Sequence, residues 1–383
     1  MTTDVPAPPT PSSPTPGLLL ASTQDVLGAV PYLVGFHPSD SLVVIGLKGR
    51  PPRCRLHLTV RWDLPLAPPG PGRLLPLLAE EGITQVIVVG YGPGTLVTPA
   101  VDLAVGLFRR SGVTVVDALR AEDGRYWSYT CSRAGCCPAD GTPYDRETGV
   151  VATKAIVHGL VALPDRQTLE RSLDPVDGAA RLAVRRATAR VTRELRAALT
   201  GSDDPGGLAA EFVADGVARV RSAIALHASG GRLSDEEAVR LGFALAVVRI
   251  RDEAWALITD HAAAVPPSAP MSVPDACAGL WRDLTRRLEP RFVPPVASLL
   301  GAAAWCRGDS ALAGIALSRA CEIDPGYSMA NLLMCALRHM LPPRVLRERM
   351  PGPQELDREM GAPRMAWLLP MIALLEEPEV SAE

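Results

Sequence analysis

The chain has 383 residues, of which 47% are hydrophobic, and a formal net charge of -3 at pH 7. This length and hydrophobic content can bury a sizeable core and predict two or three compact units. The nearly balanced charge argues against nucleic acid as a partner and excludes an acidic solvating chain.

The N-terminal residues and the longest apolar runs predict neither export nor a membrane span. Residues 1–17 are mostly Pro, Thr and Ser, which is typical of a disordered tail and not of a signal peptide. The charge-free runs 292–306 and 365–375 are too short or too interrupted by proline to cross a bilayer. We therefore expect a cytoplasmic protein, whose eight cysteines are thiols or metal ligands before they are disulfides.

The first half of the chain predicts strands that alternate with helices. A short helix at 23–30 leads into the polar turn 37–41 and then into the apolar run 42–47, which is typical of a strand buried on both faces. Residues 53–61 alternate between apolar and polar side chains, as in a strand with one wet face. Further helices are expected near 73–81 and 99–110, and further strands at 85–90, 113–119 and 126–129, the last two joined by a turn at 122–124.

This order predicts an α/β domain at 18–160, with a mixed, mostly parallel sheet, helices and right-handed crossovers. Beyond it only stripes at helical spacing occur, which predicts an all-α domain. Its helical regions are expected at 161–265 and 271–349, and residues 350–383 are expected to form a loosely ordered tail.

Local signals within the helical half allow three further predictions. Ser234 and Glu237 form a capping box that should begin a long helix ending near His261. Asp252 falls within the apolar stripe of that helix, so we expect it to pair with an arginine if it is buried. The six arginines between residues 181 and 196 are expected on a solvated outer face, because no nucleic-acid motif accompanies them.

One helical pair, within 295–325, matches the tetratricopeptide pattern in register. Small residues such as Gly301 and Ala313 let two antiparallel helices approach closely, and Pro325 ends the second helix. The match covers about one repeat, with Ala297 and Ala304 at positions where aromatics are usual. Because several stacked repeats normally make a peptide groove, we expect this pair to be a packing unit.

Three strings of the sequence together resemble a known family. They are PYLVGFHPSDSLVVIGL at 31–47, DGRYWSYTC at 123–131 followed by CCPADGTP at 136–143, and WCRGDSALAGIALSRACEIDPGY at 305–327. In these strings the chain is similar to the bacterial, actinobacterial-type proteins known as the domain of unknown function 4192 family, from about residue 18 to about residue 349. The resemblance implies a cytoplasmic protein and assigns neither an activity nor catalytic residues.

The polar turn before the first apolar strand is one candidate catalytic site. His37, Ser39, Asp40 and Ser41 offer a base, two hydroxyls and a carboxylate, which suffice for general acid–base chemistry if they converge. Turn formation alone also explains these residue types, with Ser39 and Asp40 bonding their own turn and His37 packing beside Pro38. Both interpretations stay open.

A glycine-rich connection is a candidate cofactor-binding site. Gly90, Gly92, Gly94 and Thr95 follow a buried strand and precede a helix, where backbone amides can receive a phosphate or other anion. Their spacing is neither the dinucleotide fingerprint nor a P-loop, and Pro99 is expected to delay the helix. Such turns also arise for steric reasons alone.

Three cysteines, Cys131, Cys136 and Cys137, are candidate metal ligands on the loop that follows the strand at 126–129. Zinc takes four tetrahedral ligands, commonly from Cys pairs two to four residues apart, so this set is incomplete. A fourth ligand would come from elsewhere, with these residues available by type: His37, His57, Cys54 and His158. Buried structural thiols and a reversible disulfide are the alternatives.

Two functions from different classes follow from these features. The first is an interaction or scaffold protein, which binds a protein partner through its helical half. The alternative is a hydrolase- or transferase-type enzyme that uses the loops 37–41 and 90–95 at the ends of the sheet, where α/β folds place ligands. Convergence of both loops and the cysteines on one deep pocket would favour the enzyme.

Overall fold

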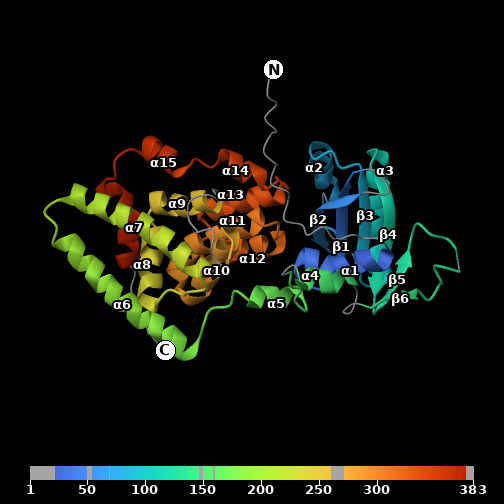
Figure 1. Ribbon diagram of the computed structural model, residues 1–383, viewed down its shortest axis with the longest axis horizontal. Helices are drawn as coiled ribbons and strands as arrows, with labels where there is room; N and C mark the ends of the chain where they lie inside the picture. The colour runs from blue at the N-terminus through green and yellow to red at the C-terminus, as the bar shows by residue number, and fades with distance from the viewer. Residues whose placement is uncertain are drawn as a thin grey trace, which may run out of the picture. The chain divides into compact units, whose positions relative to one another are not determined.

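The computed structural model describes residues 22–49, 54–68, 70–133, 135–145, 150–157, 160–259 and 271–376. The chain forms two compact units that divide between Thr168 and Leu169. The first unit is α/β and the second is helical (Figure 1). This confirms the expected order of an α/β domain followed by an all-α domain.

The α/β unit is built on one six-stranded sheet with the strand order β2-β1-β3-β4-β5-β6. Only the pair β3 and β4 is parallel, whereas the other neighbouring pairs are antiparallel. The strands are β1 (Ser41–Lys48), β2 (Arg55–Asp63), β3 (Gln85–Tyr91), β4 (Thr114–Glu122), β5 (Arg125–Ser128) and β6 (Thr142–Pro143).

The sheet is therefore mixed, as predicted, but the expectation that it is mostly parallel is wrong. Short connections join β1 to β2 and β4 to β5, and short connections can only make antiparallel pairs. The crossover through helix α2 (Leu74–Glu80) does link two strands of the same direction, β2 and β3, but β1 lies between them. Only the crossover through α3 (Gly94–Arg110) joins parallel neighbours.

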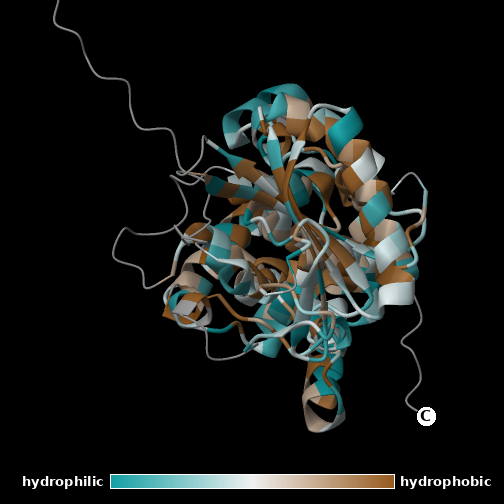
Figure 2. Cartoon of the chain, turned by 90° about the vertical axis from the view of Figure 1, so that its right-hand side faces the viewer, coloured by the Kyte–Doolittle hydropathy of each residue, from teal (hydrophilic) through white to brown (hydrophobic). Residues whose placement is uncertain are grey.

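Strand β1 lies in the interior of the sheet and is buried on both faces, as its uncharged run predicts. Figure 2 shows hydrophobic residues gathered on the strands of this unit. Helix α3 packs closely against the sheet at Gly90, where an added Cβ would lie 2.1 Å from Val97 Cγ1. Glycine at this position is what makes room for the helix. Helix α1 (Thr23–Val34) begins with a capping box at Ser22, ends at the left-handed Gly35, and packs against α4 (Val150–Val157).

The second unit contains helices and no strands among its described residues. Helix α5 (Arg166–Arg171) lies at the division between the units. The remaining helices are α6 (Gly178–Thr200), α7 (Pro205–Ala228), α8 (Asp235–Leu245), α9 (Val248–Thr259), α10 (Val273–Arg287), α11 (Val293–Cys306), α12 (Ser310–Ile323), α13 (Ser328–Arg338), α14 (Arg344–Arg349), α15 (Pro353–Met360) and α16 (Leu369–Glu376).

Two parts of this unit differ from the sequence-based expectation. The capping box at Ser234 is present, but the long helix that it should begin breaks at residues 246–247 into α8 and α9. The expected loose tail instead contains α15 and α16, which bury Leu356 and Met371. Neither feature has a local signal, because residues 246–247 include no glycine or proline and the tail helices depend on a distant core.

The predicted close helical pair is α11 and α12. A Cβ added at Gly301 would lie 2.7 Å from Leu317 Cγ, so the small residue is what allows this approach. Asp309 caps α12 by accepting a hydrogen bond from the Leu312 backbone N–H at 3.0 Å. The contact has the character of a packing unit, and its likeness to a tetratricopeptide repeat stays a prediction.

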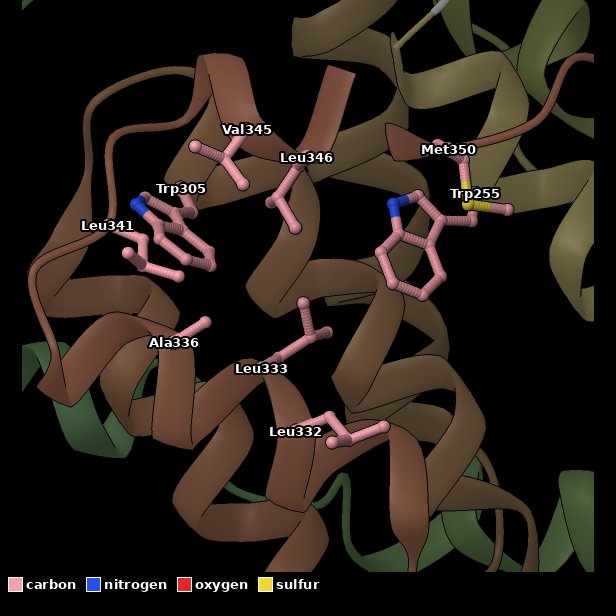
Figure 3. A pocket seen from close by; sticks show the side chains of 9 residues that line it. All are labelled: Trp255, Trp305, Leu332, Leu333, Ala336, Leu341, Val345, Leu346 and Met350. Carbon is pink, nitrogen blue, oxygen red and sulfur yellow. The ribbon is translucent and has the colours of Figure 1, made fainter. Parts of the chain in front are cut away.

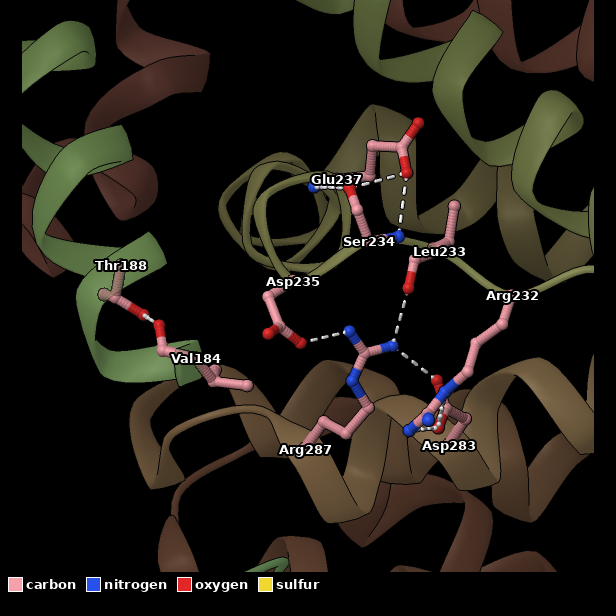
Figure 4. Close-up of polar contacts among 9 residues, drawn as sticks. All are labelled: Val184, Thr188, Arg232, Leu233, Ser234, Asp235, Glu237, Asp283 and Arg287. Carbon is pink, nitrogen blue, oxygen red and sulfur yellow. Dashed lines mark hydrogen bonds and ion pairs between the residues drawn. The ribbon is translucent and has the colours of Figure 1, made fainter. Parts of the chain in front are cut away.

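Charged side chains are paired inside the helical unit. Arg287 is buried and donates to the Leu233 carbonyl, Asp283 and Asp235, at 3.0, 2.8 and 2.5 Å respectively (Figure 4). Asp252 accepts from Arg251 at 2.8 Å, which confirms the expected arginine partner. Among the described residues, the most deeply buried carboxylate belongs to Glu253, which the sequence did not single out.

Candidate functional site

A polar cavity of about 230 Å³ lies at one end of the sheet in the α/β unit. It forms where the parallel strands β3 and β4 end beside the start of β1. Ligands of α/β folds commonly bind at the carboxyl ends of parallel strands. The polar or aromatic side chains that line the cavity are His37, Ser39, Asp40, Tyr91, Glu122, Asp123 and Tyr144.

Two special backbone positions hold Asp40 at this cavity. Asp40 has a φ of 41°, which few residues other than glycine adopt, and its carbonyl accepts from the Leu64 N–H at 2.8 Å. Beside it Gly92 has a φ of 125°, and an added Cβ there would lie 2.8 Å from Asp40 Oδ1. Glycine at position 92 is therefore what leaves room for the Asp40 carboxylate.

Three of the four candidate residues in the polar turn 37–41 line the cavity, and the fourth stabilises the turn. His37, Ser39 and Asp40 line the cavity, and the His37 backbone N–H donates to the Leu163 carbonyl at 2.9 Å. Ser41 is fully buried, accepts from Arg61 Nε at 2.9 Å and donates to the Ser39 carbonyl at 2.5 Å. Ser41 thus has a structural role in this turn, and the other three stay candidates for proton transfer.

The four residues of the glycine-rich connection do not form one phosphate cradle. Gly90 lies within β3 and serves packing, and Gly92 alone lines the cavity. Gly94 and Thr95 belong to the first turn of α3, which begins at Gly94 with Pro99 inside it, so the expected delay of the helix is wrong. A Cβ at Gly94 would meet Arg120 Nη1 at 2.6 Å, which gives this glycine a steric role as well.

The charge of the cavity lining is negative. Asp40, Glu122 and Asp123 supply three carboxylates, and neither Lys nor Arg is among the lining residues. Arg120 offsets part of this negative charge, because it donates to Glu122 at 3.1 Å. Its guanidinium lies 3.7 Å from the centre of the Trp127 ring. The cavity therefore favours a ligand that carries positive charge.

The three predicted cysteines do come together, although away from the polar cavity. The Sγ atoms of Cys131, Cys136 and Cys137 all lie within 4.8 Å of one another, and those of Cys131 and Cys136 are 3.1 Å apart. They lie on the loop between β5 and β6, at the edge of the sheet opposite to β2. None of the three lines the cavity, so the convergence expected for an enzyme is only partly present.

The thiols influence one another's ionisation. Hydrogen bonds from the Arg133 backbone and from the thiols of Cys136 and Cys137 lower the pKa of Cys131. The hydrogen bond with Cys131 and desolvation raise the pKa of Cys137 to about 12. One thiolate forms first and opposes the next, as expected for acidic groups that share a small volume.

Three of the four residues considered from the sequence as a fourth metal ligand are not beside this cluster. Cys54 donates to Gln85 and His57 pairs with Glu81, at 3.6 and 2.9 Å. Both belong to the β2 edge of the sheet, and His37 lines the polar cavity. His158 lies outside the described residues.

The helical unit has an apolar groove of about 230 Å³ that the sequence did not predict. Trp255 and Trp305 line it together with side chains of α13 and α14, and the lining includes Leu332, which is 71% exposed (Figure 3). Trp255 Nε1 is buried and has no hydrogen-bond acceptor within the described part of the chain. The groove therefore has apolar walls with an exposed leucine, whereas the indole N–H of Trp255 is shielded from solvent.

The sequence also did not predict three residues that line the polar cavity: Glu122, Asp123 and Tyr144. Glu122 and Asp123 stand at the end of a predicted strand, and polar residues at strand ends were the available signal. Tyr144 follows the cysteine loop, and only the pairing of β5 with β6 brings it back to the sheet.

Comparisons with known proteins identify a family and no further relative. No curated protein matches the chain, and no solved structure does. Among the described residues, no helix is long and apolar enough to cross a membrane. The family model described as Domain of unknown function (DUF4192) matches residues 24–344, so the chain belongs to that family.

Proposed function

We propose that the α/β unit binds a small ligand with a positively charged amine in the polar cavity. The observation that carries this proposal is the convergence of His37 to Asp40, Tyr91 to Pro93 and the β4–β5 turn on one negatively charged space. Carboxylates such as Asp40 and Asp123 form charge-assisted hydrogen bonds with ammonium groups, and the rings of Tyr91 and Tyr144 add cation–π attraction.

The size of the cavity limits the ligand. At about 230 Å³ it is smaller than the range of roughly 300–1,000 Å³ that is usual for drug-sized ligands. A compact amine therefore fits better than a nucleotide or a peptide. We also propose a cytoplasmic location, as the sequence predicts.

An enzyme that uses this cavity would act by proton transfer. His37 can donate and accept a proton, and Asp40 offers a second acid–base group in the same cavity. Both are within the space that a bound amine would occupy. This arrangement supports a hydrolase or transferase acting on an amine-bearing substrate, and ligand binding is the step to test first.

The expected result of a binding test is selectivity for charge. Calorimetric titration with small diamines such as 1,4-diaminobutane should give binding that the matching diols do not give. Asp40→Asn should weaken the amine affinity roughly 10-fold, because it removes one charge-assisted contact. Asp102→Asn, which removes an exposed carboxylate of α3 outside the cavity, should leave it unchanged. Equal affinities for diols and diamines would contradict the proposal, as would equal effects of the two substitutions.

A second candidate function is an interaction with a protein partner through the apolar groove of the helical unit. The favouring observation is the set of apolar walls around Leu332, an apolar side chain that is 71% exposed. We infer that the occupant is an apolar segment of a partner protein that packs against Leu332 and the Trp255 ring.

A probe with an apolar body tests the groove. The dye 8-anilinonaphthalene-1-sulfonate has an apolar body and acceptor oxygens, and we expect its fluorescence to rise on binding. Leu332→Asp should weaken dye binding about 10-fold, and Trp255→Phe should weaken it less, because an aromatic wall of the groove stays in place. Leu182→Asp, at a 49% exposed position on α6, is the matched control. If all three variants bind the dye like the unmodified protein, the groove is not the binding surface.

A further inference from the structure

We propose that Cys131, Cys136 and Cys137 bind one Zn²⁺ ion and leave its fourth coordination position open to an external ligand. The proposal is independent of the amine cavity. It rests on three sulfur atoms within 4.8 Å of one another, which no other group of possible metal ligands among the described residues matches.

The spacing of the sulfur atoms suits zinc. A Zn–S bond is about 2.3 Å long, so two thiolates of a tetrahedral site lie about 3.8 Å apart. The separation of 3.1 Å between the Cys131 and Cys136 sulfurs, and the limit of 4.8 Å for the set, bracket this value. Small side-chain rotations bring all three atoms to it. Thiolates are soft ligands, which select zinc over Mg²⁺ or Ca²⁺.

The first end of the cysteine loop is held in place without a metal. Ser128 Oγ accepts from the Cys131 backbone N–H at 3.2 Å and donates to Asp117 at 3.1 Å. Thr130 donates to the same Asp117 oxygen at 2.6 Å. The backbone N–H groups of Cys136 and Cys137 both donate to the Arg133 carbonyl, which fixes the turn between the ligands.

The other end is packed around Trp127. The indole N–H donates to the Ala139 carbonyl at 2.9 Å, and Arg125 donates to the Gly141 carbonyl at 3.0 Å. Gly141 has a φ of 78°, and a Cβ there would lie 2.6 Å from the Trp127 ring. The loop is thus preorganised at both ends, which is what holds metal ligands in a binding geometry.

The missing fourth ligand defines the kind of site. Structural zinc sites have four protein ligands, whereas sites that act on an external molecule have three and keep one position for water or a substrate. Within the described residues the cluster has three ligands, and Cys136 is exposed to solvent. We therefore place a water molecule at the fourth position of the resting site.

Zinc binding by the three thiols needs no oxidant, reductant or other reactant. Each thiol that becomes a ligand loses its proton, so up to about three protons are released per ion and no electrons move. A disulfide between Cys131 and Cys136 would need an oxidant and would leave Cys137 unused. A metal ion uses all three sulfur atoms, whereas a disulfide would use two.

Metal analysis of the full chain tests the proposal. Protein purified under reducing conditions without chelator should contain about one zinc ion per chain. After the zinc is removed, Co²⁺ should produce the absorption bands of a thiolate-bound tetrahedral ion, and added Zn²⁺ should abolish them. Reduced metal-free protein that takes up neither ion overturns the proposal, whatever the behaviour of any variant.

Substitutions locate the site. Cys136→Ser should weaken zinc binding by at least about 100-fold, because losing a direct ligand exceeds the 10–100-fold effect of losing an outer contact. Cys335→Ser removes an equally exposed thiol on α13 and should change nothing. Equal metal content in both variants would overturn the assignment, and circular dichroism confirms that each variant is folded.

Discussion

Replacing Glu253 by alanine is expected to lower the free energy of unfolding by about 3–5 kcal/mol. Glu253 is fully buried, and Arg249 beside it is 4% exposed. Arg249 Nη1 donates to Glu253 Oε2 at 2.9 Å, and Arg221 donates to the other oxygen at 2.6 Å. The substitution removes the carboxylate and leaves the buried Arg249 guanidinium without one of its ion-pair partners.

Urea unfolding followed by circular dichroism measures this effect, because most of the helical signal comes from the unit that contains Glu253. Asp357→Ala is the matched control. Asp357 also accepts from Arg249, at 2.6 Å, but its side chain is 69% exposed. Its removal should lower the free energy of unfolding by about 1 kcal/mol or less. Similar losses in both variants would show that the burial of Glu253 does not determine its contribution.

Arg287→Ala is expected to lower the free energy of unfolding by about 2–4 kcal/mol. The Arg287 side chain is 5% exposed and joins α10 to the start of α8 through Asp235 and the Leu233 carbonyl (Figure 4). Without it the carbonyl loses its partner and the two helices lose a shared contact. The effect should be smaller than that of Glu253→Ala, because Asp235 and Asp283 are partly exposed and can be hydrated.

Arg232→Ala provides the comparison within the same cluster. Arg232 donates to Asp283 at 2.7 Å, but its side chain is 63% exposed. Exposed ion pairs contribute about 0.2–1 kcal/mol, so this variant should unfold at nearly the same urea concentration as the unmodified protein. If Arg232→Ala is as destabilising as Arg287→Ala, then burial is not what makes the contact with Arg287 strong.

Features that depend on neighbouring residues could be predicted from the sequence. The apolar run 42–47 is β1, the turn at 122–124 joins β4 to β5, and the capping box at Ser234 begins α8. Each of these is determined by contacts within a few residues, or by a period that matches a strand or a helix. The proximity of Cys131 and Cys136 also follows from their short separation along the chain.

Features that depend on which segments become neighbours could not be predicted in this way. The alternation of strands and helices does not reveal that β2 and β3 flank β1, and this pairing makes the sheet mostly antiparallel. The break between α8 and α9 has no local marker either. In both cases the contacts are between residues far apart in the chain, and their packing outweighs local preference.

The sequence by itself determined the two-part architecture, the buried strand β1 and the polar character of the turn that contains His37 and Asp40. Only the tertiary structure decided that Asp40, Gly92 and Glu122 line one cavity, and that Ser41 lies outside it. The sheet order places β1, β3 and β4 side by side, so their ends meet although long stretches of sequence separate them. Residue types set the chemistry that a side chain can perform, whereas strand pairing and close approach at glycine determine which side chains act together.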